Sequence, residues 1–135
     1  MCISTALSST KNQICNIDFS IDTYHGEVVV LLKPVGKITK EVLLLTKPFI
    51  EDALAESPEK SVRLIIDATE FSGWEYDSFL EDVKLGLRHR KDIDKIAFCG
   101  HQHWQEIIVE LANHIMNADV QYFEHLPEAE LWATL

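Results

Sequence analysis

The sequence predicts an α/β protein in which a mixed β-sheet of about five strands is flanked by helices, in the order β-β-α-β-α-β-α-β-α. Two short segments, 62–66 and 93–99, are apolar at most positions, which is typical of strands covered on both faces of a sheet. Stripes of apolar residues with helical spacing follow both segments, as expected for helices that pack one face on a sheet. Strands that alternate with helices form right-handed crossovers, so most of the sheet is expected to be parallel.

The beginning of the chain predicts an antiparallel hairpin behind a loose arm. Residues 1–12 are small and polar, and they predict an arm that precedes the folded domain. Residues 16–21 alternate apolar and polar side chains, the pattern of a half-buried strand near a sheet edge. A turn at Tyr24-His25-Gly26 separates this strand from a second one over residues 27–33, so the two are expected to pair antiparallel.

The third predicted element is a helix from Thr39 to about residue 56. Pro34-Val35-Gly36 ends the preceding strand, and the Thr39 hydroxyl is a suitable N-cap. Pro48 interrupts the helical pattern, so it kinks or restarts the helix at the cost of a backbone hydrogen bond. The apolar stripe of this helix consists of Val42, Leu45, Phe49 and Ala53.

The central unit, residues 62–89, combines a buried strand, a short loop and a helix. The strand ends at Asp67, and residues 68–73 break the pattern, with Ser72 and Gly73 as turn residues. From residue 75 to about residue 90 the period is helical, with acidic side chains first and basic ones last, which complements the helix macrodipole. The apolar stripe is formed by Tyr76, Phe79, Leu80, Val83 and Leu87.

The last part of the chain continues the alternation of strands and helices. Gly100 is the turn between the strand at 93–99 and a helix over 102–116. A short strand at 120–123 and a closing helix at 127–135, with Pro127 in its first turn, complete the order. No linker or internal repeat interrupts residues 13–135, which predicts one domain. The stripe of helix 102–116 consists of Trp104, Ile107, Ile108, Leu111, Ile115 and Met116.

Charge and composition limit the classes of function. The net charge of −10 argues against nucleic-acid binding, which needs clustered Lys and Arg, and disfavours broad attraction to anionic membranes. No apolar run approaches the roughly 20 residues of a spanning helix, and the first residues lack the features of a signal peptide. Three cysteines, Cys2, Cys15 and Cys99, have no recurrent spacing, which predicts free thiols in a reducing compartment. We therefore expect a cytoplasmic protein, with peripheral contact with a membrane left open.

One stretch, LEDVKLGLRHRKDIDKIAFCG over residues 80–100, combines spaced polar residues with a specific order of elements. Together with Trp104 it resembles the SpoIIAA-like family, small bacterial relatives of the STAS domains, over roughly residues 14–135. The resemblance implies a mixed sheet flanked by helices, no established enzyme activity, and a role as a carrier of apolar ligands or a membrane-associated module. The matching residues are Gly73-Trp74, Asp82, Lys84, Gly86 and His89, and Gly36-Lys37-Ile38-Thr39 and Pro48 are consistent with them.

The STAS relatives also suggest a phospho-switched regulator similar to the anti-sigma-factor antagonists. In that branch the acceptor serine lies in an Asp-Ser-Ser-Gly-type loop before the second helix. The corresponding loop here reads DATEFSGWEYDS, and none of its hydroxyls, on Thr69, Ser72 and Ser78, clearly takes that role. His101 also stands where relatives tend to carry an acidic residue.

A third hypothesis is a metal-dependent enzyme that uses Cys99, His101 and His103, because thiolate and imidazole are zinc ligands. The stretch crosses a turn, however, and the sequence has no second paired cluster of the kind found in strong zinc motifs. Asp67 ends a buried strand, where α/β folds place functional groups, but no base, nucleophile or oxyanion donor stands at a suitable spacing. We therefore expect no catalytic site, no metal and no cofactor.

Aromatic residues at the starts of two adjacent helices favour a non-enzymatic binding module. Such residues line apolar pockets or lie at lipid–water boundaries, although large aromatics also bury for packing alone. The expected partner is an apolar small molecule, a lipid or a protein, bound through helices 75–90 and 102–116, and a homodimer is left open. The candidate ligand-binding residues are Phe71, Trp74, Tyr76, Phe79, Leu80, Val83, Leu87, Trp104 and Ile108, and the candidates for contact with an anion are Lys84, Arg88 and His89.

Overall fold

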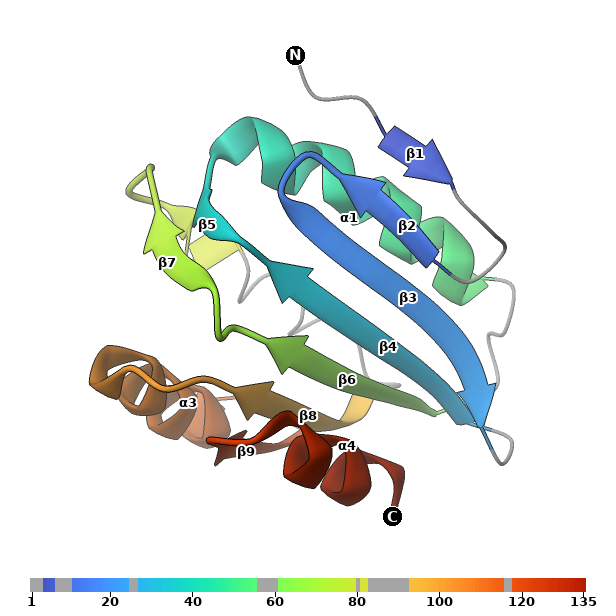
Figure 1. Ribbon diagram of the computed structural model, residues 1–135, viewed down its shortest axis with the longest axis vertical. Coiled ribbons are helices and arrows are strands. Elements are labelled where there is room, and N and C mark those ends of the chain that lie inside the picture. Colours follow the sequence, from blue (N-terminus) through green and yellow to red (C-terminus); the bar gives the residue numbers. More distant parts are fainter. Residues whose placement is uncertain are drawn as a thin grey trace.

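The computed structural model describes residues 4–6, 11–24, 27–55, 61–79, 81–82, 93–115 and 118–135. A main sheet of seven strands has the order β1-β2-β3-β4-β6-β8-β9, and a sheet of two strands, β5 and β7, lies beside it (Figure 1). The predicted fold class, a mixed sheet flanked by helices, is confirmed, and the main sheet has more strands than the five expected.

The predicted strands correspond to β3 (Ile17–Tyr24), β4 (Glu27–Pro34), β6 (Val62–Asp67), β8 (Ile93–Cys99) and β9 (Asp119–Phe123). The additional ones are β1 (Ser4–Ala6), β2 (Lys11–Ile14), β5 (Gly36–Ile38) and β7 (Phe71–Trp74). The helices that lie wholly within the described residues are α1 (Lys40–Ala55), α3 (His103–Ile115) and α4 (Leu126–Thr134), the last with Pro127 in its first turn as predicted.

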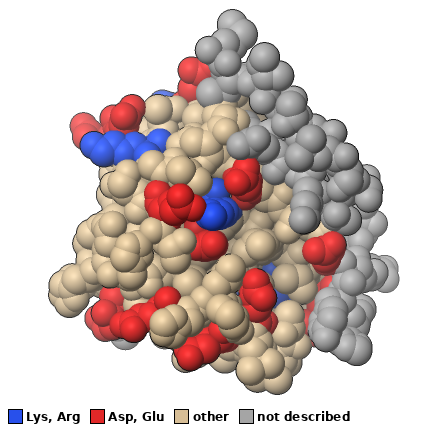
Figure 2. Space-filling view, in the orientation of Figure 1, with Lys and Arg blue, Asp and Glu red and all other residues tan. Residues whose placement is uncertain are grey.

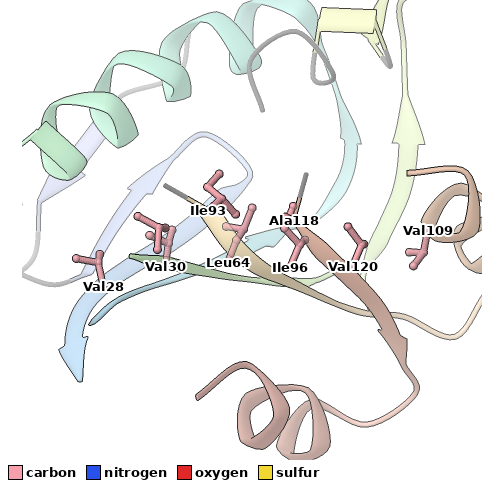
Figure 3. Close-up of a cluster of buried hydrophobic side chains, with 9 residues drawn as sticks. Val28, Val30, Leu64, Ile93, Ile96, Val109, Ala118 and Val120 are labelled. Carbon is pink, nitrogen blue, oxygen red and sulfur yellow. The ribbon is translucent and has the colours of Figure 1, made fainter. Parts of the chain in front are cut away.

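The direction of the parallel strands decides where the helices lie. Strands β1 to β4 are antiparallel, whereas β4, β6, β8 and β9 are parallel and follow one another across the sheet in chain order. Because right-handed crossovers that proceed in one direction place their helices on one face, α1 and α3 lie on the same side of the sheet. Helix α4 lies on the opposite side (Figure 3).

The main core fills the space between the sheet and its crossover helices. Side chains from neighbouring strands stand on this face together, with Val109 of α3 packed over them (Figure 3). The buried members are Val28, Val30, Val62, Leu64, Ile93, Ile96, Val109, Ala118 and Val120. A smaller core on the opposite face joins the sheet to α4 through Ile65, Ala97, Cys99, Ala129 and Ala133.

Two cations from the sheet hold the end of α4. The Arg63 guanidinium donates through Nη1 to the carbonyl oxygens of Ala133 (3.0 Å) and Leu135 (3.2 Å), and through Nη2 to Glu27 Oε1 (2.9 Å). Lys95 Nζ donates to the carbonyls of Trp132 (3.1 Å) and Leu135 (3.3 Å). The last carbonyls of a helix lack partners within the helix and carry partial negative charge, so these two side chains stabilise the docked helix.

Thr39 is the N-cap of α1, as predicted from the sequence, since its Oγ1 accepts a hydrogen bond from the backbone N–H of Val42 (3.2 Å). We expect Thr39→Ala to lower the free energy of unfolding by about 1 kcal/mol, because that N–H would lose its partner. Urea unfolding followed by far-ultraviolet circular dichroism measures the change. Ser72→Ala, at an exposed position of β7, is the matched control; an equal loss in both variants would contradict the capping role.

Residues 1–12 were expected to form a loose arm, and where the structure describes this part of the chain Ser4–Ala6 and Lys11–Ile14 pair as strands. Strand β2 joins β3 through the two residues Cys15 and Asn16, and Cys15 has a φ of 52°, which suits a tight turn. The Asn16 side chain anchors this turn by donating to the carbonyls of Val35 (2.6 Å) and Lys37 (2.9 Å). The sequence of β2, KNQI, lacks the alternation of apolar and polar residues from which β3 could be predicted.

The turns predicted after two of the strands instead contain β5 and β7, which pair parallel to each other. Both strands are very short and include a glycine with positive φ, 71° at Gly36 and 121° at Gly73, a conformation that favours glycine over residues with a side chain. Their glycine-containing sequences therefore read as turns. The helical face of α1 also differs from the prediction: Leu45 is 39% exposed, whereas Thr46 is 4% exposed and donates to the carbonyl of Val42.

The cysteines differ from the prediction of three free thiols. Cys15 is disulfide-bonded, so the prediction is wrong for this residue, whereas Cys99 is free and buried. Cys2 lies outside the described residues. Within the part of the chain that the structure describes, no helix has the length and apolar character needed to cross a membrane.

Candidate functional site

Five aromatic side chains predicted to bind a ligand lie in one continuous cluster. The Trp74 and Phe79 rings stack with centroids 4.9 Å apart, and Trp74 meets Trp104 edge to face at 5.9 Å. Phe71 contacts both Phe79 (6.3 Å) and Trp104 (5.9 Å), and Tyr76 meets Phe79 at 5.8 Å. The prediction that these residues gather is confirmed. We call Phe71, Trp74, Tyr76, Phe79 and Trp104 the aromatic cluster.

Local backbone contacts bring these side chains from three segments of the chain. Phe71 and Trp74 are the first and last residues of β7, and Trp104 is in the first turn of α3. The backbone N–H of Glu75 donates to the carbonyl of Ile38 (3.1 Å), which ties the segment after β7 to β5. The Trp104 indole N–H also donates to Gln102 Oε1, which orients the ring.

Gln105 links the chain segments that carry the aromatic cluster, and its polar side chain is completely buried. Its Nε2 donates to the carbonyls of Ala68 and Phe71, each at 3.1 Å, and its Oε1 accepts from the N–H of His101 (3.3 Å). One side chain thus joins the start of α3 to the segment that enters β7. This role could not be predicted from the sequence, because a glutamine in the first turns of an amphipathic helix is normally exposed.

A gradient of burial runs through the aromatic cluster. Phe71 is buried with Ile17, Ile38, Val42 and Ala68, which form its floor. Trp74, Tyr76, Phe79 and Trp104 are only partly buried, so their rings present apolar surface toward solvent. Aromatic rings bury large apolar areas and accept flat or aliphatic groups against their faces. The arrangement therefore offers an apolar surface with a rigid, hydrogen-bonded support.

The remaining candidate ligand-binding residues fall at the edge of the site or beyond the described chain. Phe79 and residues 81–82 are helical, which marks the start of the helix predicted from residue 75. Ile108 lies on α3 and is partly buried. The other candidates for apolar contact, Leu80, Val83 and Leu87, and those for contact with an anion, Lys84, Arg88 and His89, lie outside the described residues.

Tyr76 carries the hydroxyl group of the aromatic cluster. Its hydroxyl is buried, and Asp82 is the described acidic residue that acts on it. Burial raises the pKa of the Tyr76 phenol above its ordinary value of 10.0, and the negative charge of Asp82 raises it further. The phenol is therefore neutral in the folded chain at neutral pH, and the ring acts as an apolar body.

Tyr76→Phe tests this assignment through pH. Because the folded chain holds the proton more tightly than the unfolded chain, Tyr76 contributes stability below pH 10 that is lost as the pH rises through the raised pKa. The variant should match the wild type at pH 7 within about 1 kcal/mol, which is the usual net contribution of a single hydrogen bond such as the one to Asp82. Urea unfolding at pH 7 and at pH about 10.5 should show a smaller alkaline loss in the variant. An unchanged alkaline loss would contradict the assignment.

The carboxyl ends of the parallel strands hold other candidate residues, which the structure keeps apart. Cys99 is fully buried against α4, whereas His101 and His103 are exposed, so the three proposed zinc ligands do not converge. Burial, followed by the charges of Asp67 and Glu130, raises the pKa of the Cys99 thiol. The described residues contain no group of three metal-ligating side chains. Cys99 is thus a neutral core residue.

The hydroxyls considered for phosphorylation lie in different surroundings. Thr69 donates through its side chain to Asp67 Oδ1 (2.7 Å), which also accepts from the Thr69 N–H (3.2 Å). Ser72 is exposed on β7, and Ser78 is partly buried with its Oγ 3.5 Å from Asp82 Oδ2. Asp67 therefore accepts the hydrogen bonds that close the turn after β6. This structural role explains why its side chain is buried.

Comparison with known proteins agrees with this architecture. The model of the SpoIIAA-like family matches residues 29–134. A crystal structure of an uncharacterized protein of the DUF3478 family with a SpoIIAA-like fold, from Shewanella loihica PV-4, is similar with a TM-score of 0.74 and 28% identity, covering 96% of this chain and 99% of that one. No curated protein matches the chain. Since the family match covers residues 29–134 of the 135-residue chain, the chain belongs to the SpoIIAA-like family.

Proposed function

We propose that the chain is a non-enzymatic binding module whose aromatic cluster receives an apolar small ligand. The observation that carries the proposal is the contact between Trp74, Phe79 and Trp104, whose rings are partly exposed although they touch one another. Aromatic rings of an ordinary core are enclosed on all sides, whereas these leave apolar surface for a further group to cover.

The polar residues beside the cluster support binding without chemistry. The side chains of Gln102 and Gln105 are occupied by Trp104 and by backbone groups, and the Tyr76 phenol is kept neutral. These groups orient rings and strands, and none of them is placed as a base or nucleophile. The net charge of −10 also makes a small apolar molecule a better occupant than an anionic membrane surface.

Tryptophan fluorescence tests the proposal, because the chain has a built-in control. Trp74 and Trp104 belong to the aromatic cluster, whereas Trp132 lies on the opposite face beside Phe123. In the Trp132→Phe protein the remaining tryptophans are Trp74 and Trp104 of the aromatic cluster. In the double variant Trp74→Phe/Trp104→Phe the remaining tryptophan is Trp132, which serves as the control. Dodecanoic acid and dodecanol are titrated into both proteins.

We expect a saturable change in emission from the Trp132→Phe protein and none from the protein that retains Trp132 alone. Both ligands should act, because the cluster recognises the alkyl chain. The absence of a saturable change in the Trp132→Phe protein, or an equal change in both proteins, would refute the proposal. Neutral vesicles added in a parallel titration show whether a lipid surface occupies the cluster instead, and binding to vesicles without binding of either free ligand would also refute it.

A further inference from the structure

The face of the sheet that carries α4 contains a hollow that is separate from the aromatic cluster. Helix α4 packs on β6, β8 and β9, and in Figure 1 it lies over that part of the sheet and does not extend across β3 and β4. Val29, Leu31 and Ile65 form the floor of the hollow, which has a volume of about 270 Å³ and is open to solvent. Its size suits a small molecule with a short aliphatic part.

Polar groups border this floor on two sides. Strand β3 contributes Ser20 and Asp22, and α4 contributes Glu130 and Thr134. The strand register places Asp22 opposite Val29, and Ser20 opposite Leu31, which in turn pairs with Ile65. A row of apolar side chains therefore lies between a carboxylate on the strand and a carboxylate on the helix.

The charged side chains that line the hollow are all negative. Its lining includes two carboxylates and no basic residue. Arg63, the buried cation on this face, is engaged by Glu27 and by the last carbonyls of α4, and Lys95 is engaged by the same helix end. Acidic side chains are also widespread over this face of the molecule, with few basic ones (Figure 2). A positive group is thus complementary to the hollow, whereas an anion is repelled.

We infer that this hollow binds a small aliphatic amine, with its ammonium group toward Asp22 and Glu130 and its alkyl chain on Val29, Leu31 and Ile65. The Ser20 hydroxyl is an available acceptor for the ammonium, and the Thr134 hydroxyl, which donates to the carbonyl of Glu130 (2.8 Å), still has acceptor capacity. The site needs both parts, because the charge selects the ligand and the apolar floor covers one side of its alkyl chain.

Methyl NMR titration with hexylammonium tests the inference, with hexanol and hexanoate as probes of the same chain length. We expect saturable shifts at the methyl groups of Val29, Leu31 and Ile65, and no shifts at Val109 and Val120 on the other face. Hexylammonium should bind several-fold more tightly than hexanol, and hexanoate should not bind. Equal binding of hexylammonium and hexanol, or shifts that avoid the floor, would overturn the inference without any variant.

A double variant then tests whether Asp22 and Glu130 supply the negative charge that attracts the amine. Asp22→Asn/Glu130→Gln should weaken hexylammonium binding by about two- to fivefold for each carboxylate, because both are exposed to solvent. The matched control is Asp119→Asn/Glu110→Gln, which removes the same charge at exposed positions outside the hollow. Equal weakening in both variants would show that overall charge alone attracts the amine, and that result would overturn the assignment of the site.

Discussion

Gln105→Leu is expected to lower the free energy of unfolding by about 3–5 kcal/mol. The change keeps the volume of the side chain but leaves the carbonyl of Phe71 and the N–H of His101 without their side-chain partner. Each buried polar group without a hydrogen bond costs about 1–3 kcal/mol. The carbonyl of Ala68 loses less, because it also accepts from the N–H of Phe71.

Urea unfolding measures this change, and Gln121→Leu is the matched control, because Gln121 is exposed on β9. The control should alter stability by no more than about 0.5 kcal/mol. Gly100 supplies an independent check, since a Cβ at this position would collide with Gln105 Oε1. Gly100→Ala should therefore cost much less in a Gln105→Ala background than in the wild type. Additive losses, or a Gln105→Leu protein as stable as the control, would contradict the role of Gln105.

Arg63→Met is expected to destabilise the chain by about 2–4 kcal/mol. Arg63 is 8% exposed, and it holds Glu27 and two carbonyls at the end of α4 at the same time. Removing one partner of a buried ion pair usually costs about 3–5 kcal/mol, and the lower range here reflects the side chain of Glu27, which is 33% exposed and can be hydrated. Methionine retains the apolar stem but none of the donors.

Hydrogen exchange of the α4 amides distinguishes a local effect from a general one. In Arg63→Met we expect these amides to exchange faster relative to those of β6 and β8, because the helix loses its anchor before the sheet opens. Lys37→Met, at an exposed position of β5, is the control for loss of a positive charge and should leave the exchange unchanged. An Arg63→Met protein with wild-type protection in α4 would contradict the anchoring role.

The fold could be predicted because its main determinants are local patterns. The apolar run of β6, the hairpin of β3 and β4 and the N-cap at Thr39 each depend on neighbouring residues, and all three are confirmed. Strand β2 escaped prediction because its pairing with β3 depends on the turn at Cys15, where the backbone has positive φ. The disulfide bond of Cys15 depends on the spatial arrangement of the chain, which spacing in the sequence does not reveal.

The candidate site was predicted in part for a similar reason. Aromatic residues at the predicted starts of two adjacent helices suggested a cluster that includes Trp74 and Trp104, and the structure places their rings 5.9 Å apart. Gln105 was missed because its importance comes from carbonyls more than 30 residues away along the chain. The hollow beside α4 was missed because it depends on how much of the sheet that helix covers, and no periodicity records this.

Nuclear Overhauser effects between unlabelled dodecanol and the ¹⁵N-labelled indole groups test most directly whether the aromatic cluster is the binding site. The three tryptophans give separate indole signals, two from the cluster and one from the opposite face of the sheet. At saturating ligand we predict cross-peaks from the alkyl chain to Trp74 and Trp104 and none to Trp132. Cross-peaks to Trp132 alone, or no cross-peaks to any indole, would contradict the account.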